Sequence, residues 1–298
     1  MELITQPADG LAPILDAVEK ARTTLDILIF RFDLKPLEKA IEAAVERGVT
    51  VRALIAHVNR GGERRLRQLE LRMLDAGVTV TRTPDHLARY HGKLLIVDRE
   101  ELHVYGFNYT AFDLKSRSFG VIARDRRIVQ EALRLFESDV HRHDFEPSAD
   151  SLVVSPENAR TQLGSFLRRA KKSLAIWDPK LTDAQMIRLL LQRAKAGVDV
   201  RVIGKVAKLG CDLHAQKMPG LRLHVRAIVR DGEEAFVGSQ SLRALELDGR
   251  REVGLLARDA KIVKGLLEVF EADWAKTELG HKELKAAQKD LDLAEAAG

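Results

Sequence analysis

The chain has 298 residues, 45% of them hydrophobic and 31% charged, so it can form one large or two ordinary domains, and its composition excludes a disordered chain. The single cysteine, Cys211, excludes an internal disulfide and any zinc site built from several cysteines. The net charge of +5 favours an anionic partner, but it does not choose among nucleic acid, lipid head groups and phosphorylated metabolites.

No apolar run approaches the roughly 18 residues that a membrane span needs, and the amino terminus lacks the basic segment of a signal peptide. We therefore expect a soluble, cytoplasmic protein, with peripheral contact at a membrane surface left open. The pair Gly61-Gly62 lacks the flanking pattern of a nucleotide-binding loop, and no Walker sequence is present. No cofactor is expected.

The first half of the chain opens with a β-α-β pattern. Apolar periodicity predicts a helix at 11–21, a strand at 25–30, a helix at 37–47 and a strand at 49–55. A basic helix is expected at 63–76, followed by strands at 78–82, 93–97 and 102–105. A strand at 119–123 and a helix at 127–140 complete this half.

The second half repeats this order. It is predicted to contain helices at 159–170, 184–195 and 261–274 and strands at 174–177, 198–203, 227–229, 235–237 and 253–257. A linker rich in Pro, Ser and Asp separates the halves. We expect a first half at 1–145, a linker at 146–156, a second half at 157–275 and a helical surface tail at 276–298.

A short motif occurs once in each half. His91-Gly92-Lys93 is followed by Leu-Leu-Ile-Val and Asp98, and His224-Val225-Arg226 is followed by Ala-Ile-Val-Arg and Asp231. The surrounding sequence is duplicated as well, because Gly-Val-Thr-Val-Arg at 48–52 matches Gly-Val-Asp-Val-Arg at 197–201. Since the spacing survives in a diverged repeat, coincidence is improbable, and the two copies are best explained as a fused pair of halves.

The spacing of the motif suits phosphoryl chemistry. On an extended strand, side chains two residues apart lie on one face, so the imidazole and the cation stand side by side. The apolar run that follows anchors the pair in a sheet. Rigid positioning and charge stabilisation supply most of the catalysis in phosphoryl transfer. Asp98 and Asp231 are expected to serve the turn and local charge balance, because they lie several strand positions from the histidines.

The motif resembles that of the phospholipase D superfamily, whose signature is His-x-Lys-x4-Asp followed by Gly-Ser-x-Asn. The first copy continues as Tyr-Gly106-Phe-Asn108, without the serine, and the second as Gly-Ser239-Gln-Ser241, without the asparagine. Family members also carry a later glutamate that orients a histidine; Glu252 matches it, whereas the first copy has Ser118. The resemblance runs from about residue 21 to residue 274.

The resemblance implies an α/β fold of two tandem α-β-α sandwich halves with mixed sheets, related by a pseudo-twofold axis, with the active site at their interface. It implies metal-independent cleavage of phosphodiesters, in which His91 attacks phosphorus, His224 protonates the leaving oxygen, and water or an alcohol resolves the phosphohistidine. The reverse assignment of the histidines stays open. A monomer holding both halves would suffice.

The remaining site residues follow from the same resemblance. Lys93, Arg226 and Asn108 are expected to hold the non-bridging oxygens of the phosphate. Substrate contacts are expected for Ser239, Ser241, Gly106 and Thr110. Arg226 is the main departure, because a planar guanidinium is larger than the lysine ammonium that it replaces. It could preserve activity, narrow the substrate range or mark a half that only binds.

Other clusters are weaker candidates. His141 and His143 end a helix before the linker without a second ligand cluster, so a surface location is favoured over a metal site, and no metal is expected. His86 and His103 are left unassigned. An arginine-rich segment is either a solvated helix face or a substrate-facing arm. It contains Arg60, Arg64, Arg65, Arg67 and Arg72.

Three functions are therefore considered. The first is a phospholipase D-like phosphodiesterase or phosphatidyltransferase of the cardiolipin or phosphatidylserine synthase type. The second is a nuclease of the same superfamily, favoured if the arginine-rich segment lines up with the histidines. The third is a catalytically weakened phosphate-binding module, suggested by Arg226, Ser241 and Ser118. An aromatic content of only 5% argues mildly against the lipid enzyme.

Overall fold

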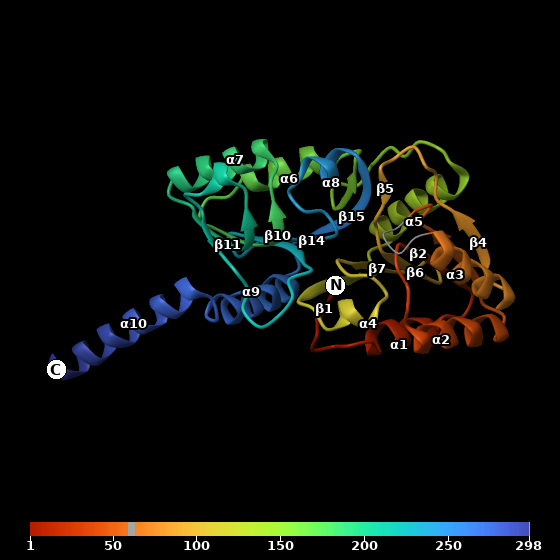
Figure 1. Ribbon diagram of the computed structural model, residues 1–298, viewed down its shortest axis with the longest axis horizontal. Coiled ribbons are helices and arrows are strands. Elements are labelled where there is room, and N and C mark those ends of the chain that lie inside the picture. Colours follow the sequence, from red (N-terminus) through yellow and green to blue (C-terminus); the bar gives the residue numbers. More distant parts are fainter. Residues whose placement is uncertain (59–62, 298) are drawn as a thin grey trace.

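Two mixed β-sheets, one centred in each half, form the frame of the molecule (Figure 1). The computed structural model describes residues 1–58 and 63–297. In the first sheet the strand order is β1 (Glu2–Gln6), β8 (Ser118–Ala123), β7 (Glu101–Tyr105), β6 (Leu94–Val97), β2 (Thr24–Ile29), β3 (Thr50–Ile55) and β4 (Thr79–Arg82). Strands β2, β3 and β4 run parallel, and the other neighbours pair antiparallel.

The second sheet repeats this plan. Its order is β12 (His214–Gln216), β11 (Asp199–Val206), β10 (Ser173–Leu181), β13 (Arg226–Arg230), β14 (Glu234–Gly238) and β15 (Arg250–Ala257), with β9 (Leu152–Ser155) paired to β15. Each strand has a counterpart in the first sheet, β9 corresponding to β1. The duplication seen in the sequence is therefore a duplication of the fold.

One strand crosses between the halves. The two-residue strand β5 (Arg89–Tyr90) belongs to the first half in sequence, but it pairs in parallel with β15 of the second sheet. A smaller bridge runs the other way, between Arg117 and Leu223. Because His91 and His224 follow directly after these crossing segments, each histidine is carried to the opposite half.

Helices cover both faces of the sheets. They are α1 (Ala12–Lys20), α2 (Lys35–Glu46), α3 (Glu63–Asp75), α4 (Ala111–Leu114), α5 (Arg126–His141), α6 (Ala159–Arg168), α7 (Ala184–Lys195), η1 (Lys208–Gly210), α8 (Ala244–Asp248), α9 (Ala260–Trp274) and α10 (Glu278–Ala297). Along β2, Ile27 packs in the cluster with α1 and α2, whereas Leu28 packs in the cluster with α5, as the two-residue alternation of a strand requires.

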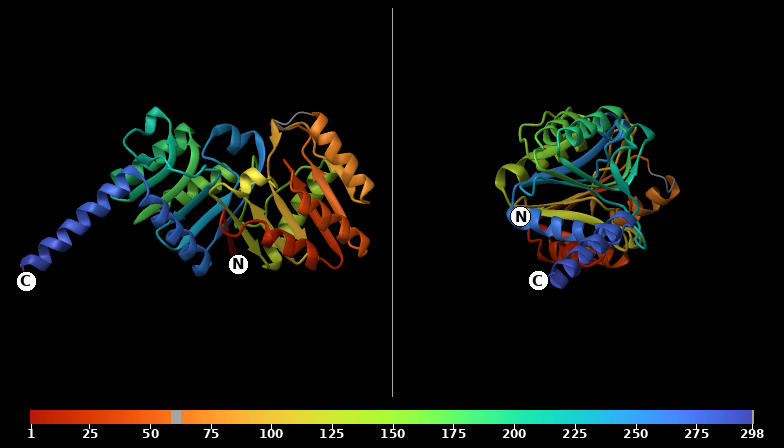
Figure 2. Two further views of the ribbon diagram at one scale, coloured as in Figure 1. Left: turned by 60° about the horizontal axis from the view of Figure 1, so that its bottom comes forward. Right: turned by 90° about the vertical axis from the view of Figure 1, so that its left-hand side faces the viewer.

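The cluster around α5 is shared by both halves. It joins Leu94 and Val104 of the first sheet to Ala227 and Val253 of the second. The halves lie side by side along the long axis of the molecule, and α10 projects from the end of the second half (Figures 1 and 2). Among the described residues, no helix has both the length and the apolar character needed to cross a membrane.

Several elements were not expected from the sequence. The strands β1, β5 and β12 and the short helices α4 and α8 lie in segments that carried no prediction. Residues 152–155, inside the expected linker, form β9 and pair with β15. The expected arginine-rich segment is described only from residue 63 onward, so Arg60, Gly61 and Gly62 lie outside the described residues.

Candidate active site

Both histidines lie where the two halves meet. The backbone N–H of His91 donates to the Arg251 carbonyl oxygen in β15 at 2.7 Å, and that of His224 donates to the Arg117 carbonyl oxygen at 3.0 Å. Only 9% of the His91 side chain and 12% of the His224 side chain are exposed. The reciprocal backbone hydrogen bonds thus fix each imidazole against the opposite half.

His91 is held from two sides. Its Nδ1 lies 2.8 Å from Oε2 of Glu252, a fully buried carboxyl group of the second half. Its ring packs edge-on against Phe30, with centroids 4.5 Å apart. Because an ionised carboxylate only accepts hydrogen bonds, this contact favours the tautomer of His91 that carries its proton on Nδ1.

Lys93 lies against the same imidazole. Its Nζ is 2.9 Å from Nδ1 and 3.0 Å from Nε2 of His91, and it also contacts the His91 carbonyl oxygen. Burial lowers the pKa of Lys93 to about 7, with Arg226 lowering it further and Glu252 opposing the shift. The ammonium group is therefore poised to lose or gain a proton near neutral pH.

His224 faces a carboxylate that the sequence did not single out. Its Nδ1 lies 3.3 Å from Oδ1 of Asp113, a buried residue of α4 in the first half. Asp113 also accepts hydrogen bonds from the Arg222 guanidinium at 2.7 Å and the Asn108 side-chain amide at 2.5 Å. Burial alone would raise the pKa of Asp113, but His224, Arg222 and Asn108 lower it to about 2.

Asp113 fills a gap in the repeat. In β8, Ser118 occupies the position that Glu252 occupies in β15. The strand register shows this equivalence: Gly120, two residues after Ser118, pairs with Tyr105, and Gly254, two residues after Glu252, pairs with Gly238. The Ser118 hydroxyl is buried, and it has no hydrogen-bond partner in the part of the chain that the structure describes. The carboxylate facing His224 therefore comes from α4 instead of the neighbouring strand.

One signal for Asp113 was present in the sequence. Asp113 follows Asn108 by five residues, and Glu246 follows Ser241 by five. In each half this carboxylate accepts the backbone N–H of the earlier residue, at 3.0 Å for Asn108 and 2.8 Å for Ser241. An acidic residue thus follows the last residue of each motif by five positions. This spacing is repeated in both halves, as the spacing of the histidines is, and it could have identified Asp113.

Arg226 lies beside the second motif. Its Nε donates to the Ser241 hydroxyl at 3.2 Å and lies 3.9 Å from Oε2 of Glu246. Its Nη1 is buried and has no hydrogen-bond partner among the described residues. One N–H of the Asn108 amide is committed to Asp113, and the second remains available, since a side-chain amide carries two donors.

The two motifs form a single electrostatic cluster. Burial lowers the pKa of both His91 and His224 well below the usual value, and the positive charges of Arg226 and Lys93 lower both further. Burial raises the pKa of Glu252, while Lys93 opposes that shift. A buried group of cations with depressed histidine pKa values is an arrangement that an anion would stabilise.

Three expected substrate contacts have other partners in the structure. The Ser239 hydroxyl is fully buried and donates to the Val253 carbonyl oxygen at 3.3 Å. Thr110 caps α4 through the Asp113 backbone N–H. At Gly106, an added Cβ would lie 3.0 Å from the Gly238 carbonyl oxygen, so this position holds β7 close to the second half.

The two motif aspartates lie away from the histidines. Asp98 accepts backbone N–H groups of residues 22–24, and Asp231 accepts those of residues 171–173. Both have positive φ angles, 52° and 55°. Burial would raise the pKa of each, but these N–H groups lower it. Asp98 therefore links the turn after β6 to the segment that enters β2, and Asp231 links the turn after β13 to the segment that enters β10.

The remaining histidines lie outside this cluster. His141 and His143 are exposed at the end of α5, and His86 is exposed. His103 is buried and bonded to Glu101 at 2.6 Å. Within residues 1–58 and 63–297, no group of three or more His, Cys, Asp or Glu side chains is placed to hold a metal ion.

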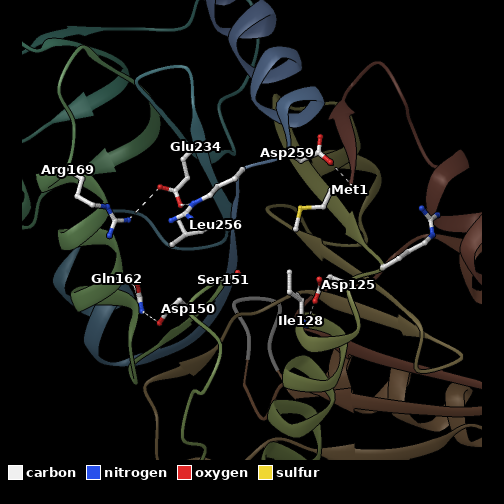
Figure 3. Close-up of a pocket in the computed structure, with 12 residues that line it drawn as sticks. Met1, Asp125, Ile128, Asp150, Ser151, Gln162, Arg169, Glu234, Leu256 and Asp259 are labelled. Carbon is white, nitrogen blue, oxygen red and sulfur yellow. Dashed lines mark hydrogen bonds and ion pairs between the residues drawn. The ribbon is translucent and has the colours of Figure 1, made fainter.

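A cavity of about 700 Å³ lies elsewhere at the seam between the halves (Figure 3). Some of its charged groups pair with one another: the Met1 ammonium lies 3.1 Å from Asp259, and Glu234 accepts from Arg258 at 3.0 Å. Neither motif histidine lines this cavity. It therefore contributes nothing to the chemistry described above.

Solved structures share this fold. Polyphosphate kinase from Porphyromonas gingivalis superposes with a TM-score of 0.75 at 17% identity. The superposition covers 91% of this chain and 49% of the kinase, so this chain spans about half the length of the kinase. Phosphatidylserine synthase from Haemophilus influenzae Rd KW20 superposes with a TM-score of 0.71 at 11% identity, over 93% and 86%. Such distant likeness shows the fold alone, and it confirms the expected fold class of two mixed-sheet halves.

A match at the sequence level identifies the family. No curated protein matches the chain. The family described as "Cardiolipin synthase, PLD-like domain" matches it over residues 14–140 and 163–274, which together span most of both halves. The expected resemblance is thereby confirmed, and the chain belongs to this phospholipase D-like family.

Proposed function

We propose that the chain is a phosphodiesterase or phosphatidyltransferase that acts through a phosphohistidine on His91. The observation that carries this proposal is the reciprocal orientation of the histidines. Glu252 of the second half holds His91, and Asp113 of the first half faces His224. Two imidazoles, one hydrogen-bonded to and the other facing a carboxylate of the opposite half, supply a nucleophile and a proton donor in one site.

The steps follow from the hydrogen bonds. His91 attacks phosphorus through Nε2, because Nδ1 is bonded to Glu252. The bond between phosphorus and the leaving oxygen breaks, and that oxygen takes a proton from His224. Water, or an alcohol in a transfer reaction, then gives its proton to His224 and attacks phosphorus, which releases His91. An anionic phosphate bound between the motifs would raise the pKa of His224 and keep it protonated for the first step.

The cations supply the cradle for the transferred group. Lys93 and the unpartnered Nη1 of Arg226 would hold the non-bridging oxygens, and the free N–H of Asn108 adds a third donor. Both histidines come from one chain, so a monomer built of halves 1–145 and 157–275, joined by 146–156 and followed by the tail 276–298, suffices for activity.

The test is turnover of bis(p-nitrophenyl) phosphate in excess chelator by the wild type, His91→Ala and His224→Ala. Turnover that survives the chelator and is lost in His91→Ala supports the proposed mechanism. The alternative of a phosphate-binding module rests on Arg226 and Ser241, which replace the expected lysine and asparagine. Phosphodiester binding that is equal in wild type and His91→Ala, without turnover in either, would favour that module.

A further inference from the structure

A groove of about 550 Å³ opens beside the proposed active site. Thr110 and Asp113 line one end of it, and Asp113 lies 3.3 Å from the His224 imidazole. Arg31 lines another part and directly follows Phe30, whose ring packs against His91. The groove therefore reaches Asp113, which faces His224, and its lining includes the residue next to Phe30 in the chain.

Helix α3 forms the outer wall of this groove. Arg65 and Arg72 line it from α3, and Leu66 and Leu69 lie buried at its base. The second half has no counterpart of α3, because only η1 and β12 lie between β11 and β13. The groove thus exists on one side of the pseudo-twofold axis, and it would give a bound substrate a single direction.

Two cations of the groove carry no ion pair within the described ranges. Glu38 binds both Lys35, at 2.9 Å, and Arg72, at 2.5 Å, so these two cations share one carboxylate. Arg31 and Arg65 have no acidic partner among the described residues, and Nε of Arg31 is buried without a hydrogen bond there. Both guanidinium groups are available for an anion outside the reacting phosphate.

An exposed aromatic ring stands at the inner end of the groove. Phe112 is 64% exposed, although large apolar residues usually cover more of their surface. The Arg222 guanidinium lies 4.3 Å from its ring centroid. An exposed aromatic ring in the same groove as two arginines that lack an acidic partner among the described residues suits single-stranded nucleic acid, whose bases stack on rings and whose phosphates are held by cations.

The lining does not suit acyl chains. Charged residues outnumber apolar ones around the groove, and the apolar pair at its base is covered. A lipid would require a continuous apolar surface for its chains. A nucleotide chain presents a phosphate and a flat base at each step, which the two free arginines and Phe112 complement.

We propose that this groove binds single-stranded nucleic acid adjacent to the scissile phosphodiester. A neighbouring phosphate lies on Arg31 and Arg65, and a base stacks on Phe112. This inference rests on the proposed function, because it assigns the substrate of the same site. The arginine-rich segment of the sequence would then contribute to the substrate surface through Arg65, whereas Arg64 and Arg67, which are exposed and do not line the groove, would not.

The matched pair Arg65→Glu and Arg67→Glu tests this proposal. Both substitutions reverse one exposed charge on α3, so they change the overall charge equally. Binding of an end-labelled oligothymidylate is measured by fluorescence anisotropy in the His91→Ala background, which prevents turnover. We expect Arg65→Glu to weaken binding about tenfold, or about 1.4 kcal/mol. The slope of the logarithm of the binding constant against the logarithm of the salt concentration should become shallower by about 0.7, because one phosphate contact is lost. Arg67→Glu should change binding by less than about twofold. Equal weakening by both would overturn the groove assignment.

A second pair tests the stacking platform. Phe112→Ala should weaken oligothymidylate binding about tenfold, within the range for loss of one stacked base. Leu71→Ala removes a comparably exposed apolar side chain of α3 outside the groove and should leave binding unchanged. Thermal unfolding of each variant checks that the fold is intact. Unchanged binding in a folded Phe112→Ala protein would contradict the proposal.

Two further measurements separate this inference from the proposed chemistry. Turnover of bis(p-nitrophenyl) phosphate by the wild type without oligothymidylate binding would overturn the groove assignment alone. Groove-dependent oligothymidylate binding without any turnover would support the groove and contradict the proposed function. Vesicles of phosphatidylcholine and phosphatidylglycerol form the lipid arm. If the wild type does not bind oligothymidylate, and if Arg65→Glu and Phe112→Ala weaken vesicle binding, the groove binds lipid and the proposal is wrong.

Discussion

At the scale of single residues, the site is asymmetric in its chemistry although it is symmetric in its backbone. Glu252 contacts His91 from a β-strand, whereas Asp113 contacts His224 from a short helix and is shared with Arg222 and Asn108. This difference suits the division of labour that we propose for the histidines. A nucleophile needs a fixed ring, and a proton donor needs a carboxylate that stabilises its charged form.

Asp113→Asn and Glu252→Gln should separate these two roles. We expect Asp113→Asn to lower kcat roughly 10²-fold for a diester with an alkyl leaving group, since proton donation by His224 is impaired. Its effect on the first step with a nitrophenyl diester, followed as the burst of nitrophenolate, should be much smaller, because nitrophenolate leaves without a proton. Glu252→Gln, which disturbs the nucleophile, should lower kcat for both substrates. Rates measured for the four combinations would contradict the assignment if Asp113→Asn slowed both leaving groups equally.

The protonation of Lys93 can be followed through anion binding. Its folded-state pKa of about 7 lies below the ordinary value of 10.5 because the amine is buried. Between these pH values the unfolded chain binds more protons than the folded one, so the unfavourable contribution of Lys93 to stability is largest below about 7 and diminishes as the pH rises through that window. A bound anion opposes this penalty by stabilising the ammonium form.

Sulfate is a suitable probe, because its own charge is constant near neutral pH. The increase in Tm on adding sulfate should be larger one unit below a pH of about 7 than one unit above it. Lys93→Met should remove most of this pH dependence while retaining a smaller sulfate effect from Arg226. A sulfate effect that is independent of pH in the wild type would show that Lys93 does not titrate in this range.

At the scale of elements, the sequence predicted the core strands and missed the contacts that complete the site. The apolar run after His91 predicted the strand observed as β6, and the run after Arg226 predicted β13. Strand β5 could not be predicted, because two residues carry no periodicity and their pairing partner, β15, lies far along the chain. Helix α4 has only four residues, so Asp113 lay in a segment without a helical pattern.

Two glycines let the adjacent strands β14 and β15 of the second sheet approach closely. At Gly238, an added Cβ would lie 2.6 Å from the Cα of Gly254 in the adjacent strand, so the backbone would have to move. In α6, a Cβ at Gly164 would meet nothing closer than 3.8 Å. Identical substitutions at these two positions should therefore have opposite effects.

We expect Gly238→Ala to lower the free energy of unfolding by about 1–3 kcal/mol through overpacking. Gly164→Ala should raise it by about 0.5–1 kcal/mol, because alanine is the better helix former. Urea unfolding of both variants beside the wild type gives these values. Equal stability of the two variants would show that the contact between β14 and β15 tolerates an extra methyl group.

At the scale of the whole molecule, the two halves pack against each other through a shared core. Besides the shared apolar cluster, paired ion contacts cross the seam: Arg251 of the second half binds Asp139 of α5 at 2.9 Å, and Arg117 of the first half binds Asp273 of α9 at 2.8 Å. Burial raises the pKa of Asp139 to about 6, and Arg251 opposes that shift. The duplicated sequence predicted the pairing of the halves, but these buried pairs lie outside the repeated motif.

The central claim is that His91 becomes covalently phosphorylated while His224 handles the proton. Its most direct test is to react His224→Ala with bis(p-nitrophenyl) phosphate, whose leaving group needs no proton, to quench in base, and to map the modified peptide by mass spectrometry. Without His224, the second step lacks its base, so the adduct should accumulate on His91 and should be absent from His91→Ala. An adduct on another residue, or none in a variant that still releases nitrophenolate in a burst, would contradict the mechanism.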